Sequence, residues 1–178
     1  MPSASEILFA EAGLDVWGHP SDYRPPEPPS MSAIAKLRAR YDKLEHEAAC
    51  KIWFLSCEEW EAVAHRKHEA KLAYADAITA RNRYLRWKAQ NSTRRVKSQE
   101  RKPLEDAMFE AERHLDTLIA LGSDFYTHRE FTDANAAFAL ASDLHDIAEK
   151  KFDIQEREAR ADKRAGIVRF RASRIRRN

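Results

Sequence analysis

Between residues 32 and 165 the chain consists mainly of residue types that favour α-helix, and this constrains its fold more than any other feature. Ala, Glu, Lys, Arg and Leu dominate the stretch, and the whole chain contains only 4 glycines. These five types are among those with the highest helix propensities. From Ile34 to Leu55, apolar residues recur every three or four positions, which aligns them along one stripe of a helix. The sequence therefore predicts an all-α protein, an antiparallel bundle of about three long main helices.

The main helices are expected over residues 32–90, 103–129 and 132–165, which together form the bundle. A continuous helix over residues 32–90 would be about 90 Å long. That is longer than a compact domain of this size needs. The alternative is a break near residues 65–68 or near Asn82.

The connections are predicted from residues that end or begin helices. Asn, Ser and Thr in residues 91–102 indicate a loop, and Pro103 suits the first turn of the next helix. Gly122 has two interpretations. It either ends a helix or lies within one and packs tightly against a neighbour. The last helix is expected to begin at Thr132 or Asp133, since both residue types are good N-caps.

Both ends of the chain are expected to lie outside the bundle. Residues 1–31 precede the bundle. In them a short amphipathic helix is expected over residues 3–14, followed by an extended proline-rich arm. Residues 166–178 form an arginine-rich tail that begins at Gly166. Apolar residues are present in both termini, which favours docking on a partner over extension into solvent.

The sequence KIWFLSCEEW, residues 51–60, predicts a belt of aromatic contacts. Its consecutive apolar residues point around a helix, so Trp53 and Phe54 need cover beyond that of one helical neighbour. Either the N-terminal helix with Trp17 or a second subunit would supply that cover, and both alternatives stay open. Aromatic anchors are typical of interface centres and of ordinary cores. The expected protein-interface residues are Ile7, Phe9, Trp17, Trp53, Phe54, Trp60, Phe170 and Ile175.

Charge is unevenly distributed along the chain, although the net charge is only +2. Residues 81–102 hold nine Lys or Arg and one acid, a net of +8, and residues 163–178 hold seven Lys or Arg and no acid, a net of +7. The remainder of the chain therefore carries −13. Alternating helix directions would bring both basic segments to one end of the molecule and leave the other end acidic. Such polarity favours a head-to-tail contact between copies, or a basic end that meets an anionic surface.

The two basic segments also predict a possible nucleic-acid surface. Lys and Arg would neutralise phosphates, and the rings of Tyr84 and Trp87 would stack on unpaired bases. The alternative without a binding role is that residues 81–102 form a solvated face and that the tail only increases solubility. The candidate contacts to nucleic acid or another anionic partner are Arg81, Arg83, Tyr84, Arg86, Trp87, Arg94, Arg95, Lys97, Arg169, Arg171, Arg174, Arg176 and Arg177.

Residues 115–148 resemble one tetratricopeptide repeat, a unit of two helices. The residues at the spacing of that family's signature are Leu118, Leu121, Gly122, Phe125, Phe131, Ala134, Phe138 and Ala141. The sequence departs from the family at the turn, where Arg129 and Glu130 replace Gly and Asp, and at Asp146, which replaces a closing proline. The resemblance implies a tight antiparallel helix pair that turns near residues 129–132. A single copy does not imply a peptide-binding solenoid, since such arrays need about three repeats.

No group of side chains in the sequence matches a catalytic or metal-binding arrangement. None of the 7 histidines has an acidic residue three positions before it, as a di-iron bundle requires. The pairs His65 with His68 and His46 with Cys50 lack a third ligand, and Cys57 lacks an evident base. We therefore expect no enzymatic activity, no metal or other cofactor, and no small-molecule substrate.

The sequence also predicts where the protein resides. No apolar run approaches the roughly 20 residues of a membrane span. Glu6 and Glu11 interrupt the first apolar stretch, which argues against a secretory signal. Cys50 and Cys57 are expected to be reduced thiols or partners for another chain. We expect a cytoplasmic protein, or a virion component if the source is viral.

These observations together favour a structural role. We expect an adaptor or scaffold subunit of a larger assembly, such as a virus or phage particle. It would contact other copies of itself or other subunits through its arm, its aromatic belt and its tail. The alternative is a nucleic-acid-binding protein that uses residues 81–102 and 163–178.

Overall fold

The computed structural model describes residues 24–51, 56–123 and 126–175, and of residues 51 and 167–175 it describes the backbone only. Within these ranges the chain forms four helices and no strand: α2 (Met31–Lys51), α3 (Cys57–Asn91), α4 (Ser98–Leu121) and α5 (His128–Ile175). The fold is all-α, as the composition predicts. The N-terminal helix expected over residues 3–14 lies outside the described residues.

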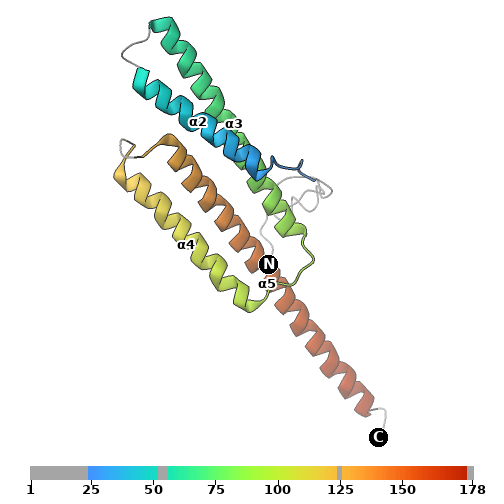
Figure 1. Cartoon of the computed structure of the whole chain (residues 1–178). Helices are drawn as coiled ribbons and strands as arrows, with labels where there is room; N and C mark the ends of the chain where they lie inside the picture. The colour runs from blue at the N-terminus through green and yellow to red at the C-terminus, as the bar shows by residue number, and fades with distance from the viewer. Residues whose placement is uncertain (1–23, 52–55, 124–125, 176–178) are drawn as a thin grey trace.

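The helices form two antiparallel hairpins (Figure 1). α2 packs along α3, α4 packs along α5, and the hairpins meet where α3 lies against α5. Because the chain reverses after each helix, α3 and α5 run in the same direction. The hairpins are offset along their length, so α2 and α3 extend beyond α5 at one end and α5 extends beyond the others at the opposite end (Figure 1). The predicted antiparallel bundle is confirmed.

Each hairpin has its own small apolar core. In the first, Tyr41 of α2 is 1% exposed and lies with its ring centroid 6.3 Å from that of Tyr74 of α3. Ile34 and Leu44 of α2 pack with them, as their spacing predicts. In the second, α4 and α5 bury a set of apolar side chains. These are Leu115, Leu118 and Ala134, with Phe131 and Phe138 packed against them.

The helix predicted over residues 32–90 is instead two helices, α2 and α3. The break comes before Ser56, and α3 is continuous through both positions where a break was considered. Its cause is a capping box. Ser56 Oγ accepts a hydrogen bond from the Glu59 N–H at 3.3 Å, and a Glu59 carboxylate oxygen accepts one from the Ser56 N–H at 2.9 Å. This arrangement satisfies two backbone donors at a helix start. Trp53 and Phe54, the predicted aromatic contacts, lie outside the described residues.

α4 begins at Ser98, five residues before the predicted start. A Glu100 carboxylate oxygen accepts a hydrogen bond from the Lys97 N–H at 3.2 Å, which stabilises the earlier start. Pro103 consequently lies in the second turn rather than the first. Because proline has no N–H, it leaves the Gln99 carbonyl without its backbone partner there.

The turn between α4 and α5 also differs from its prediction. Gly122 ends α4 with φ of 87°, a conformation that favours glycine, and its N–H points to the carbonyls of the last turn. α5 begins at His128, because Thr127 and Glu130 form a second reciprocal pair of hydrogen bonds at 3.2 and 2.8 Å. The predicted turn at residues 129–132 and the predicted starts at Thr132 and Asp133 were wrong. The expected antiparallel pair is present.

The predicted boundary between the last helix and the tail is absent from the backbone. α5 continues through Gly166 to Ile175 without interruption. A Cβ atom added at Gly166 would meet nothing within 4 Å, so the described residues give no packing reason for glycine at this position. The part of the tail up to Ile175 is therefore helical, and Arg176 and Arg177 lie outside the described residues.

Candidate interaction surfaces

A network of charged and polar side chains joins the two hairpins near the start of α5. Tyr74 Oη donates a hydrogen bond to Asp133 Oδ1 at 2.5 Å, and Arg129 Nη1 donates to Asp133 Oδ2 at 3.0 Å. Arg38 lies 3.5 Å from the same oxygen. Arg129 Nε lies 2.6 Å from Asp42 Oδ1, an ion pair whose alignment is not that of a hydrogen bond. The network fixes α2, α3 and α5 relative to one another.

This network was not predicted from the sequence. Arg129 and Asp133 are four residues apart on a helix, a spacing visible in the sequence. The pairing of Arg129 with Asp42 requires the fold, since nothing in the local sequence brings α2 to α5. The network also affects the pKa of Tyr74. Burial, and then the hydrogen bond to Asp133, raise its pKa to about 12.

The basic segment 81–102 comprises the end of α3, the connection 92–97 and the start of α4, and α5 passes beside it. Lys151 of α5 donates hydrogen bonds to the carbonyls of Ala89 and Ser92, both at 2.6 Å. Burial lowers the pKa of this ammonium group. A cation suits the end of α3 because the last carbonyls of a helix lack intrahelical partners. The α5 residue beside the connection is thus Lys151, and the expected proximity of residues 163–178 to the connection stays a prediction.

Two predicted anion contacts of this segment, Arg86 and Arg94, make ion pairs inside the molecule, and so does Arg101, which was not among those predicted. Arg86 pairs with Asp143 of α5, and Arg94 pairs with Glu100 of α4. Arg101 makes a bidentate contact with Glu149, with one hydrogen bond of 2.6 Å, and lies 4.4 Å from the ring centroid of Phe152. The hydrogen bonds from Arg101 lower the pKa of the Glu149 carboxyl.

The two rings predicted to stack on bases are packed within the protein. The Trp87 ring centroid lies 5.9 Å from that of Tyr84, and the Arg24 guanidinium lies 5.6 Å from the Trp87 ring. Both aromatic residues are half-buried. Arg24 belongs to the proline-rich arm, so the arm contacts α3 at this residue. The rings are thus less available to nucleic acid than the sequence suggests.

A smaller set of cations remains exposed at this end. Arg81 is half-buried and lines a groove described below. Arg169, Arg171 and Arg174 lie on the helical backbone of α5, and their side chains are outside the description. The exposed residues that make no ion pair with a described residue are Arg83, Lys88, Arg95, Lys97 and Lys102.

The most prominent surface is the C-terminal part of α5, residues 156–175, here called the α5 extension. Every residue from Glu156 to Gly166 is exposed. Arg160 pairs with Glu156 at 2.7 Å within the helix itself. At the standard rise the extension is about 30 Å long, and it projects alone from the bundle (Figure 1). Phe170 and Ile175, both predicted interface residues, lie on its backbone.

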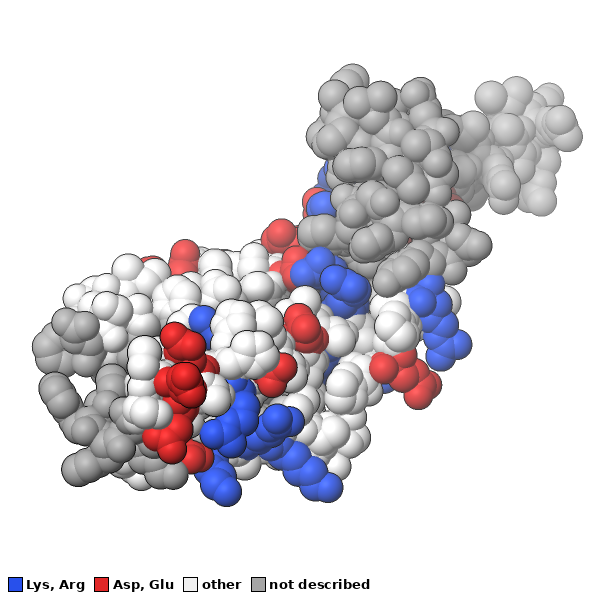
Figure 2. All heavy atoms as spheres, turned by 90° about the horizontal axis from the view of Figure 1, so that it is seen from above, with Lys and Arg blue, Asp and Glu red and all other residues white. Residues whose placement is uncertain are grey.

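The opposite end carries an acidic cluster at the start of α3, here called the acidic tip, residues 56–61. Glu58, Glu59 and Glu61 are all exposed, and Trp60 between them is 39% exposed. Of the predicted aromatic contacts, Trp60 is the one whose surroundings the structure describes. Figure 2 shows acidic and basic side chains in adjacent patches over the visible body of the molecule, so the charge separation is not complete.

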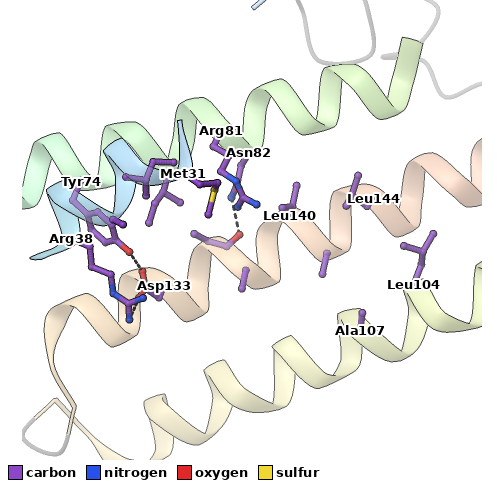
Figure 3. Close-up of a pocket in the computed structure, with 16 residues that line it drawn as sticks. Met31, Arg38, Tyr74, Arg81, Asn82, Leu104, Ala107, Asp133, Leu140 and Leu144 are labelled. Atoms are coloured by element: carbon purple, nitrogen blue, oxygen red, sulfur yellow. Dashed lines mark hydrogen bonds and ion pairs between the residues drawn. The ribbon is translucent and has the colours of Figure 1, made fainter. Parts of the chain in front are cut away.

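An apolar groove of about 470 Å³ lies between the hairpins. Figure 3 shows that all four helices contribute to it. Asn82 of α3 lines the groove, and its side-chain amide donates a hydrogen bond to the Ala136 carbonyl of α5 at 2.9 Å. Polar groups come from Arg38, Tyr74, Arg81 and Asp133, while most of the lining is Ala, Leu, Ile and Met.

The described residues contain no group of three or more His, Cys, Asp or Glu side chains placed to hold a metal ion. His46 Nε2 lies 3.4 Å from the Cys50 sulfur, as their spacing predicts, and His65 lies 3.7 Å from Glu69. Within the described ranges, no helix has the apolar length of a membrane span. Cys50 and Cys57 are free thiols.

Comparison with known proteins identifies no relative: no family model, curated protein or solved structure matches the chain. The surfaces themselves are therefore the basis for a functional proposal.

Proposed function

We propose that the chain is a non-enzymatic structural subunit that joins copies of itself, or other subunits, into a larger assembly. The α5 extension carries this proposal. It continues for about 30 Å past the bundle, and its described side chains from Glu156 to Gly166 are all exposed. Helices in proteins draw most of their stability from tertiary packing. A partner along the extension would supply that packing.

The acidic tip is the surface of this chain that best complements the extension. The extension and its end carry seven Lys or Arg between residues 163 and 178. The tip presents Glu58, Glu59 and Glu61 around the exposed Trp60. Since α3 and α5 run in the same direction, the tip and the extension lie at opposite ends of one molecule. Contact between them joins copies head to tail, an arrangement that generates rings or filaments.

Charge reversal on both surfaces tests this contact. We expect Glu58→Lys with Glu61→Lys to raise the dissociation constant of self-association by about tenfold, because like charges then meet. Lys163→Glu with Arg164→Glu should do the same. A chain with all four changes should regain most of the affinity, because every contact again joins opposite charges. The dissociation constant is measured by sedimentation velocity at low salt.

Matched controls separate the specific contact from a general charge effect. Glu110→Lys with Asp116→Lys changes the charge of exposed α4 residues by the same amount and should leave the dissociation constant unchanged. A four-change chain that associates no better than either double variant would show that the two surfaces do not meet.

Nucleic-acid binding is the second candidate function, and one observation favours it. Arg83, Lys88, Arg95, Lys97 and Lys102 are exposed without an ion pair to a described residue, and they surround the α3–α4 connection beside α5. Because the Tyr84 and Trp87 rings are half-buried and pack against each other, contacts would be mainly to phosphates. Such binding is strongly dependent on salt.

Fluorescence anisotropy with a labelled single-stranded oligonucleotide tests the second candidate. We expect Lys88→Glu, Arg95→Glu and Lys102→Glu together to weaken binding and to reduce the salt dependence of affinity. Absence of binding at low salt would eliminate this function and leave the structural proposal intact.

A further inference from the structure

We propose that the groove between α2 and α4 is the docking site of the chain's own N-terminal segment, residues 3–14, which lies outside the described residues. Docked there, the segment would complete the bundle as an additional helix. The proposal does not depend on self-association, because a monomer would bind its own segment equally well.

The groove has the form of a site for a helix. α2 and α4 form its two sides but do not pack against each other. Alanines on three helices, Ala35, Ala107 and Ala137, line it and are exposed, so small side chains leave room for a close approach. Met31 lines it as well and is 62% exposed. Because all four helices line this groove and Met31 beside it is exposed, the groove is an apolar surface that no described residue covers.

The length of the groove matches the segment. Its floor along α5 extends from Asp133 to Leu144, a distance of about 17 Å at the standard helical rise. A helix over residues 3–14 has the same number of residues. Its apolar residues Ile7, Leu8 and Leu14 would supply the side chains that the groove lacks.

The chain leads to the groove. Met31 lines the groove and begins α2, and the residues before it, which form no helix or strand, lead back to Arg24, whose guanidinium lies over Trp87. Trp87 is five residues beyond the groove residue Asn82, about 8 Å along α3. Residues 15–23 would span up to about 30 Å when extended. The connection is thus long enough for the segment to return to its own groove.

Charge also favours this occupant. Arg81 lines the groove, is half-buried, and makes no ion pair with a described residue. Arg38 lies at the end of the groove near Asp133. About half of its side chain is exposed, although it pairs with the Asp133 carboxylate. The segment contains Glu6 and Glu11 and no Lys or Arg. An acidic amphipathic helix thus fits an apolar groove that presents arginines.

Cysteine cross-linking tests the placement. In a chain with Cys50→Ser and Cys57→Ser, we introduce Ala10→Cys in the segment and Ala107→Cys in the groove. Mild oxidation should form a disulfide within a single chain, detected by peptide mapping of the monomer. Glu105→Cys, on the far side of α4, replaces Ala107→Cys in the control and should form at least tenfold less disulfide.

The remaining outcomes each overturn the proposal. A disulfide between two chains would identify the occupant as a second copy. Equal yields at positions 105 and 107, or no disulfide at either, would show that the groove does not hold the segment.

Charge and deletion supply independent readouts. Arg81→Glu should reduce the yield of the intrachain disulfide severalfold, whereas Arg83→Glu, on an exposed part of α3, should leave it unchanged. With Ala107→Cys alone, removal of residues 1–23 should increase the rate of maleimide labelling about tenfold. An unchanged rate would contradict the proposal.

Discussion

At the scale of single residues, two buried tyrosines occupy one core but have different hydroxyl environments. Tyr41 is 1% exposed, and its hydroxyl has no hydrogen-bond partner in the described part of the chain. Tyr74 is also buried, but its hydroxyl donates to Asp133 at 2.5 Å. A buried polar group without a partner costs about 1–3 kcal/mol, whereas a made hydrogen bond contributes about 1 kcal/mol. The same substitution should therefore have opposite effects at the two positions.

We expect Tyr41→Phe to raise the free energy of unfolding by about 1 kcal/mol and Tyr74→Phe to lower it by about 1 kcal/mol. Urea denaturation monitored by circular dichroism measures both values. A loss of stability in Tyr41→Phe would mean that its hydroxyl has a partner after all.

The same tyrosines predict a loss of stability at alkaline pH. Burial raises the pKa of Tyr41 to about 12, and burial together with Asp133 raises that of Tyr74 to about 12, against an ordinary value of 10.0. The folded chain therefore holds these protons more tightly than the unfolded chain. The contribution of these protonated tyrosines to the free energy of unfolding is fully present below pH 10 and is lost as pH rises from 10 to 12.

Absorbance of tyrosinate near 295 nm checks this expectation. Tyr41 and Tyr74 should ionise at about pH 12, which Tyr41→Phe and Tyr74→Phe identify by removing their part of the absorbance change, and unfolding should become easier in the same pH range. Ionisation of Tyr41 and Tyr74 near pH 10 in the folded protein would contradict it.

At the scale of helices, local hydrogen bonds decide where α3 and α5 begin. The Ser56–Glu59 and Thr127–Glu130 pairs have the same form, and each lies at a boundary that was predicted in the wrong place. In the first case Ile52 to Leu55 continue the apolar pattern of a helix, so the break is not visible in hydrophobicity. In the second the turn was predicted from a resemblance rather than from the Thr-x-x-Glu spacing.

The Ser56 cap should contribute measurably to stability. We expect Ser56→Ala to lower the free energy of unfolding by about 1 kcal/mol, because the Glu59 N–H loses its partner. Ser56→Asp, which keeps an acceptor at the cap, should retain most of the stability. If urea denaturation gives equal losses for both variants, the cap does not determine the start of α3.

Other aspects of the fold could be read from the sequence, and the reasons are local. The stripe that contains Ile34, Tyr41 and Leu44 faces α3 because its spacing is that of one helix face. Antiparallel neighbours follow from short connections. The network around Asp133 could not be read, since its partners come from α2, α3 and α5 and only the fold brings them together. The groove was missed for the same reason.

At the scale of the whole molecule, the offset between the hairpins places the acidic tip and the α5 extension at opposite ends (Figure 1). The sequence of the extension is rich in Glu, Arg, Lys and Ala, which favours helix through propensity and through pairs such as Glu156 with Arg160. A partner would add the tertiary packing that the extension lacks within its own molecule. A molecule with unlike ends is suited to repeat itself head to tail.

The molar mass of the full chain in solution, measured by sedimentation velocity over a range of concentrations at low salt, tests this account most directly. We expect species heavier than the 20.6 kDa monomer that increase with concentration. A chain that ends at Gln155, with the bundle intact by circular dichroism, should remain a monomer. A full-length chain that is monomeric at every concentration would contradict self-assembly through the α5 extension.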